Sequence, residues 1–158
     1  MSVVLCRVDD RLIHGQVVVG WGQALQLERI VLADDEVARS DWEQDLYRMA
    51  VPADLEVVFV TVAAAAQRLD EWGRDARRTA VLVGSIDAAG QLFQAAPRVM
   101  HHINLGGIHH RPGRTERLPY VYLTDEEQRQ LVRLAGAGAE ITGQDLPSTA
   151  PVPLEDLG

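Results

Sequence analysis

Short apolar runs alternate along this chain with longer segments whose apolar positions recur every three or four residues. Runs rich in β-branched residues are typical of buried strands, and the longer spacing is typical of amphipathic helices. We expect strands at residues 3–8, 29–33, 55–60, 79–83, 99–105, 120–123 and 139–146. We expect helices at residues 16–26, from 40 to about 50, 61–72, 86–95 and 124–136.

Capping residues support several of these boundaries. Ser40 is followed three residues later by Glu43, and Thr124 by Glu127, which is the spacing of a capping box. Gly73 follows an alanine-rich helical segment and is expected to end it.

The alternation of strand and helix predicts an α/β fold: an open, mostly parallel twisted sheet with helices on both faces, in a single domain. We assign residues 1–146 to this domain and residues 147–158 to a proline-containing C-terminal tail. Residues 106–119 are expected to form a polar loop. Sites in open α/β sheets lie beyond the carboxyl ends of the strands, which is where residues 9–14 fall.

Composition narrows the class of protein. The chain has 158 residues, of which 47% are apolar and 24% charged, as in an ordinary globular domain. It has 23 acidic and 15 basic residues and a formal net charge of -8. Every basic residue is an arginine, so a Schiff-base lysine and a Walker lysine are excluded. The acidic balance argues against nucleic-acid binding but suits a protein partner with a basic patch.

Neither a leader nor a membrane span is expected. Charged residues interrupt the first apolar run, and no apolar run approaches the ~20 residues that a spanning helix needs. Cys6 is the one cysteine and lies within a strand pattern, where we expect it to be a buried apolar residue. We therefore expect a cytoplasmic protein.

The first strand ends in the segment RVDDRLIHGQ, which concentrates the candidate chemistry. His14 carries the side chain whose ordinary pKa lies nearest neutrality, and it can accept a phosphoryl group as a nucleophile. Arg11 and Arg7 can supply paired donors to phosphate. Gly15 permits close approach of a phosphate to backbone amides at the start of a helix. The competing interpretation is a turn histidine in a solvated charged loop.

Two aspartates adjoin this histidine. Either Asp9 or Asp10 can accept the second ring N–H and so fix the tautomer, or can hold an arginine in place. The sequence leaves both roles open.

Two other polar groups follow strands at the same edge of the sheet. Ser85 follows the fourth strand and either donates to phosphate or turns the chain into a helix. The acids that begin at Asp34 follow the second strand and fit a solvated turn better than a magnesium site. Trp21, Trp42 and Trp72 lie in helical segments and are interpreted as packing residues.

Four histidines cluster in the segment HHINLGGIHHR, but we expect no metal site there. Adjacent residues of a strand point to opposite faces, so a histidine pair cannot chelate one ion. Gly106 and Gly107 are expected to provide backbone freedom where this strand runs into its loop. Neither a phosphate-binding loop of the Walker type nor a GxGxxG motif is present, so nucleotide binding is not supported.

Four segments closely resemble one family, the IIB components of the mannose/fructose/sorbose family of bacterial sugar phosphotransferase systems. They are RVDDRLIHGQVVVGW, LADDEVARSDWEQDLYRMAVP, INLGGIHHRPGRTERLPYVYLTDEE and GAEITGQDLP, and they span nearly the whole chain. The resemblance implies an open α/β sheet and a phosphohistidine intermediate that falls on His14. It matches Arg11 and Arg7 to the loop arginines. Asp34 departs from a common asparagine, and Gly84-Ser85 from a segment that often carries lysine.

The resemblance also implies partners. A phosphorylated IIA component would donate the phosphoryl group, and membrane IIC and IID components would present the sugar that receives it. No nucleotide, metal or other cofactor is implied. With 158 residues, we expect the IIA component on a separate chain and this protein at the inner face of the membrane through IIC and IID. A homodimer is left open, and the alternative function is a regulatory module that binds partners according to its phosphorylation state.

Overall fold

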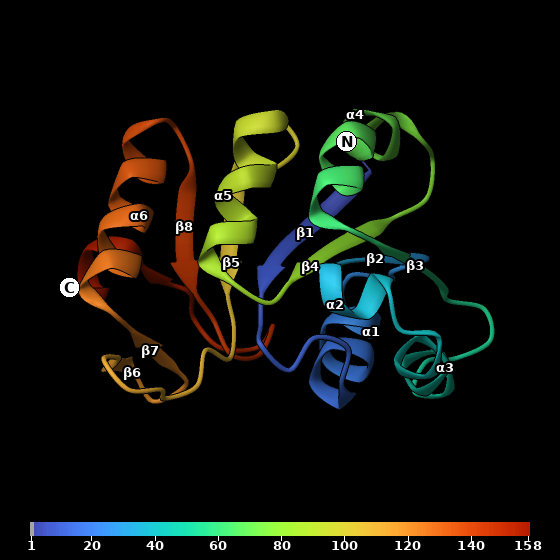
Figure 1. The fold of residues 1–158 in the computed structure, drawn as a ribbon, viewed down its shortest axis with the longest axis horizontal. Coiled ribbons are helices and arrows are strands. Elements are labelled where there is room, and N and C mark those ends of the chain that lie inside the picture. Colours follow the sequence, from blue (N-terminus) through green and yellow to red (C-terminus); the bar gives the residue numbers. More distant parts are fainter. Residues whose placement is uncertain (1) are drawn as a thin grey trace.

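A seven-stranded sheet with helices on both faces forms the molecule (Figure 1), seen in a computed structural model that describes residues 2–158. The strands are β1 (Val3–Val8), β2 (Arg29–Ala33), β3 (Glu56–Val60), β4 (Thr79–Val83), β5 (His102–Leu105), β6 (Thr115–Leu118), β7 (Val121–Leu123), β8 (Glu140–Gly143) and β9 (Val152–Pro153). The helices are the π-helix η1 (Gln16–Trp21), α1 (Gly22–Ala24), α2 (Asp35–Ala38), α3 (Asp41–Met49), α4 (Val62–Arg74), α5 (Ile86–Ala95), α6 (Asp125–Gly136) and the 3₁₀-helix η2 (Leu154–Leu157).

The strand order is β3-β2-β4-β1-β5-β8-β9. All neighbours pair in parallel except β8 and β9, which are antiparallel. This confirms the predicted α/β class. The inner strands β2 and β4 are buried at every position, because helices cover them on both faces.

The two faces of the sheet carry separate hydrophobic clusters. Helices α4, α5 and α6 lie side by side on one face and form the larger cluster with Val31, Val81 and other alternate strand residues (Figure 1). On the other face, η1 and its preceding loop pack on Ile30, Leu32 and Leu82. Loops from β1 and β4 therefore lead to opposite faces, which places a topological switch point between these two strands.

Residues 144–158 pack against the last strand of the sheet and its core. Strand β8 ends at Gly143, and the chain returns as β9 to pair with it. Helix η2 then buries Leu157 in the larger cluster. Residues 147–158, set apart in the sequence analysis, thus contribute a strand and a core side chain.

Residues 106–119 also differ from the expected loop. They contain β6, which forms a hairpin with β7, and β5 begins only at His102. The preceding residues Val99 and Met100 are buried in a turn, and their apolar character mimics a strand in the sequence.

Helix termini follow the capping signals in part. Thr124 and Glu127 form both bonds of the capping box, and Ser40 accepts from the Glu43 amide. Gly73 lies inside α4, which continues to Arg74, so the expected end was wrong by a residue or two. The short helix α2 was not predicted, although Asp34 caps it through the Val37 amide at 3.0 Å.

Two of the three tryptophans pack as expected. Trp21 and Trp72 are buried, whereas Trp42 is 67% exposed because α3 buries none of its side chains. Among residues 2–158, no helix has both the length and the apolar content to cross a membrane.

Candidate active site

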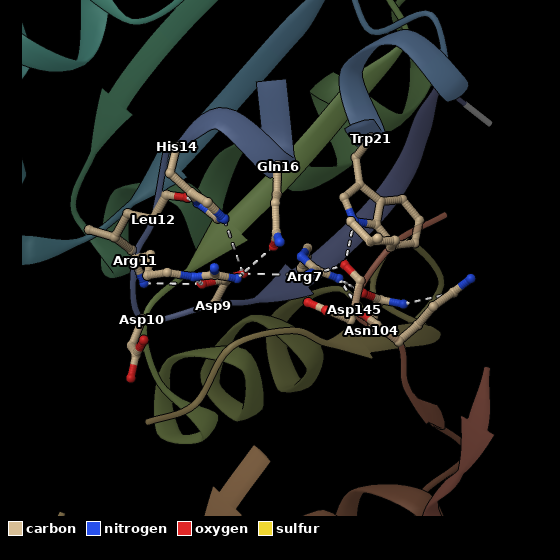
Figure 2. A network of polar contacts seen from close by, with 12 residues as sticks. Arg7, Asp9, Asp10, Arg11, Leu12, His14, Gln16, Trp21, Asn104 and Asp145 are labelled. Atoms are coloured by element: carbon tan, nitrogen blue, oxygen red, sulfur yellow. Dashed lines mark hydrogen bonds and ion pairs between the residues drawn. The ribbon is translucent and has the colours of Figure 1, made fainter. Parts of the chain in front are cut away.

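The loop after β1 is held to its neighbouring strands by backbone bonds. The Asp9 amide donates to the Val83 carbonyl at 3.0 Å, and the Asp10 amide donates to the Gly107 carbonyl at 2.8 Å. Leu12 then adopts a left-handed conformation with φ 59°, which is unfavourable for a residue other than glycine. Its buried side chain anchors this turn in the cluster under the loop, and its carbonyl points at His14 (Figure 2).

The His14 ring lies between two acceptors. Its Nδ1 is 2.9 Å from the Leu12 carbonyl oxygen, and its Nε2 is 3.8 Å from Asp9 Oδ2. A neutral ring in this position carries its proton on Nδ1, where the carbonyl can accept it, and its lone pair on Nε2. The side chain is 18% exposed, but Nε2 is enclosed and has no hydrogen-bond partner among the described residues.

Asp9 is the buried carboxylate at the centre of the loop. Its Oδ1 accepts from the Arg11 amide and from Arg11 Nε, both at 3.1 Å, and its Oδ2 accepts from Arg11 Nη2 at 3.0 Å. Arg7 Nη2 lies 3.4 Å from Oδ2. Burial acts to raise the pKa of Asp9, but the Arg11 bonds and the two guanidinium charges outweigh it and hold that pKa below its usual value.

Arg11 occupies the open side of the site. Its bond to Asp9 raises its pKa, and its Nη2 also donates to Gln16 Oε1 at 3.0 Å (Figure 2). A Cβ atom on Gly107 would lie 3.0 Å from Arg11 Nε and Nη2. The guanidinium is therefore fixed from three sides while its side chain stays partly exposed.

Arg7, in contrast, is enclosed. It donates to the Asn104 side chain, to the Gln144 carbonyl at 2.8 Å and to the Asp145 carbonyl at 3.1 Å. Its guanidinium also lies 4.9 Å from the centre of the Trp21 ring. Burial lowers the pKa of Arg7. This arginine joins β1 to β5 and to the segment after β8.

The glycines of the Asn-x-Gly-Gly segment serve close packing. A Cβ on Gly106 would collide with the Arg7 guanidinium, and neither Gly106 nor Gly107 has a positive φ. Our expectation of backbone freedom was therefore wrong, since the small size of these residues makes room for the two arginines. Gln16 and Asn104 were not predicted as arginine partners, although both lie in the segments that resemble the family.

Asp10 and Gly15 have different surroundings. Asp10 points away from His14 (Figure 2), and its carboxylate contacts the His109 amide at 2.8 Å and His109 Nδ1 at 2.5 Å. Of the two aspartates, Asp9 is the one that faces His14. Gly15 is exposed with φ -53°, and a Cβ there would meet nothing within 4 Å. The fold of this chain does not itself require glycine at that position.

Ser85 caps α5 by accepting from the Ala88 amide at 3.1 Å. It lines a cavity of about 600 Å³ that also borders Asp10 and Leu12. Ser85 therefore lies beside the active loop, while its hydroxyl is hydrogen-bonded to the first turn of α5. Among the described residues, no group of three histidine, cysteine, aspartate or glutamate side chains is arranged to hold a metal ion.

Comparisons with known proteins identify the family of this chain. A family model described as "PTS system sorbose subfamily IIB component" matches residues 3–157. The N-acetylgalactosamine-specific phosphotransferase enzyme IIB component 2 of Escherichia coli K12 is 30% identical over 157 residues, which cover 99% of this chain and 98% of the relative. The fructose-specific EIIB component of Bacillus subtilis is 24% identical over 150 residues, or 95% and 91% of the two chains.

Solved structures share the fold. The chain superimposes on manxB of Thermoanaerobacter tengcongensis with a TM-score of 0.85 at 28% identity, covering 98% of this chain and 93% of the other. It superimposes on the IIBSor domain of the Klebsiella pneumoniae sorbose permease with a TM-score of 0.87 at 24% identity, covering 99% and 96%. The chain belongs to the sorbose subfamily of IIB components, the phosphotransferases that carry phosphoryl groups in sugar phosphotransferase systems.

Proposed function

We propose that His14 accepts a phosphoryl group from the phosphohistidine of a IIA component and passes it to a sugar presented by membrane IIC and IID components. The observation that carries this proposal is the position of the ring, which lies partly exposed at the carboxyl edge of the sheet, beside Arg11. In the transfer, the P–N bond to the donor imidazole breaks and a P–N bond to His14 forms. The accepting nitrogen supplies the electron pair, and the other ring nitrogen keeps its proton.

The ring must turn before it can accept. In the orientation described, Nδ1 donates to the Leu12 carbonyl and Nε2 is enclosed against Asp9. A nitrogen that accepts a phosphoryl group needs both a free lone pair and access to the donor. Nε2 has the lone pair, and rotation about the side-chain bonds, with loss of the bond to Leu12, would give it access to the donor.

The neighbouring groups take distinct roles in this proposal. Arg11 neutralises phosphoryl charge through its open guanidinium edge, and the amide of Gly15 donates at the start of η1. Arg7 and Asp9 position Arg11 and the loop without touching phosphate. Asp10 fixes the segment that contains His109 by accepting hydrogen bonds from it, and Ser85 borders the cavity over which a partner can bind.

Incubation with phosphorylated IIA component tests the proposal. We expect wild-type protein to take up acid-labile, base-stable label and to discharge it when sugar and membranes that contain IIC and IID are added. His14→Ala should take up none. Normal labelling of that variant would reject the assignment.

The second candidate, a regulatory module, rests on the same loop. It predicts normal labelling of wild-type protein without discharge to sugar. Discharge assays with matched membranes therefore separate transport from regulation.

A further inference from the structure

Helix α3 carries an apolar stripe that the fold leaves uncovered. Trp42, Leu46 and Met49 are 67%, 54% and 82% exposed, and they follow one another at helical spacing on one side of the helix. No side chain of α3 is buried, so this helix contributes little to the core. Large apolar residues gathered on one exposed face mark interaction surfaces.

The stripe adjoins the cavity that borders the active loop. Glu43 and Tyr47 of α3 line that cavity, and Asp10 and Leu12 line it from the loop. Trp42 directly precedes Glu43 in the chain, and Leu46 directly precedes Tyr47. Because successive helical residues are about 100° apart around the axis, the stripe lies about 100° around α3 from the side that lines the cavity. A partner that covers the cavity and the adjacent side of α3 would therefore contact both the active loop at Asp10 and Leu12 and the stripe.

The charge of the cavity wall favours a positively charged partner group. Six carboxylates and two arginines line its wall. Four of the six already accept hydrogen bonds: Asp10 from His109, Asp34 and Asp35 from backbone amides, and Asp87 from the Gln91 side chain. Glu43 Oε2, in contrast, is closed to water and has no hydrogen-bond partner among residues 2–158. An enclosed carboxylate oxygen gains most from a charged donor.

We propose that the α3 stripe and this acidic cavity together form the docking surface for the phosphoryl donor, and that the docking face of the donor carries an arginine or lysine beside an apolar patch. The inference rests on the proposed function and names the partner of that same site. The cation enters the cavity and meets the carboxylates of its wall, among them Glu43, while the apolar patch covers Trp42, Leu46 and Met49.

Charge selects this occupant over two others. The cytoplasmic surface of a membrane is itself anionic and repels an acidic face. Two copies of this chain joined through this surface would bring like charges together, which opposes association. A basic face on a protein that arrives from solution has neither disadvantage.

The test is the rate of phosphoryl transfer from phosphorylated IIA component at increasing IIA concentration. Trp42→Ala with Met49→Ala should raise the half-saturating concentration about tenfold and leave the rate at saturation unchanged, because these residues act in binding only. Glu43→Gln should weaken the dependence of that concentration on salt. Val132→Ala, which truncates an exposed residue on α6, is the matched control and should match wild type.

Four outcomes overturn the docking proposal. In the first, the α3 variants keep the wild-type half-saturating concentration of IIA. In the second, they keep it and have a lower rate at saturation. In the third, they accept the phosphoryl group normally but no longer discharge it to sugar in membranes, and in the fourth, they lose a dimer that sedimentation shows for wild type. Failure of the proposed function looks different, because wild-type protein itself would then take no label from IIA.

Discussion

Arg7 and Arg11, the two arginines at the active loop, differ in burial, and this difference separates their roles. Arg7 is buried and donates to the Asn104 side chain and two carbonyls inside the fold, whereas Arg11 keeps a partly exposed edge. Both contact the buried carboxylate of Asp9. At the scale of the residue, therefore, Arg11 is the arginine whose guanidinium is accessible to a phosphoryl group.

Substitution of Arg11 should affect both stability and transfer. Arg11→Ala leaves Asp9 buried with Arg7 as its remaining cation, so we expect the free energy of unfolding to fall by about 2–4 kcal/mol. Arg11→Lys keeps a charge near Asp9 but loses the paired donors, so it should stay nearer wild type in stability and slow single-turnover transfer about tenfold. Urea unfolding and rapid-quench transfer measure the two effects. An unchanged rate in Arg11→Lys would contradict the phosphate-binding role.

The lowered pKa of Asp9 predicts an acid dependence of stability. A carboxyl whose pKa is depressed by folding stabilises the protein above its unfolded pKa of about 3.9, and this contribution is lost as the pH falls through the folded value. The free energy of unfolding of wild type should therefore fall more steeply below about pH 5 than that of Asp9→Asn. Other carboxylates contribute equally to both proteins. If the free energies of unfolding of wild type and Asp9→Asn changed in parallel with pH, Asp9 would not be the source of this acid dependence.

At the scale of the element, two glycines near the site make opposite predictions. Gly106→Ala places a Cβ against the Arg7 guanidinium and should cost about 1–3 kcal/mol in unfolding free energy. Gly15→Ala meets nothing, so its stability should stay within about 0.5 kcal/mol of wild type while transfer slows. Gly136→Ala, also unobstructed but remote on α6, is the control for both assays. Alanine keeps the amide and adds only a Cβ, so wild-type transfer in Gly15→Ala would show that the phosphoryl group does not approach this residue closely.

The sequence predicted the elements that depend on local signals. Apolar runs identified the inner strands, and Thr124 with Glu127 identified the start of α6. It could not predict the partners of Arg7, because Asn104 and Gln144 lie 97 and 137 residues away. Nor could it predict β9, since two residues carry no periodicity and pair only because the chain returns to β8.

At the scale of the whole molecule, the C-terminal segment belongs to the core. Leu157 is 1% exposed and joins the cluster under α4, α5 and α6. We expect Leu157→Ala to lower the free energy of unfolding by about 2–5 kcal/mol, as for other buried leucines. The exposed Leu46 offers a matched control, and Leu46→Ala should change stability by less than about 0.5 kcal/mol. Equal denaturation midpoints for the two variants would show that η2 does not complete the core.

The central claim is that one imidazole, at the carboxyl edge of the sheet, carries the phosphoryl group. Site mapping by mass spectrometry, after transfer from phosphorylated IIA component and digestion at alkaline pH, tests it most directly. The account predicts the phosphoryl group on His14, with His101, His102, His109 and His110 unmodified. A phosphoryl group on any of those four, with His14 unmodified, would contradict it.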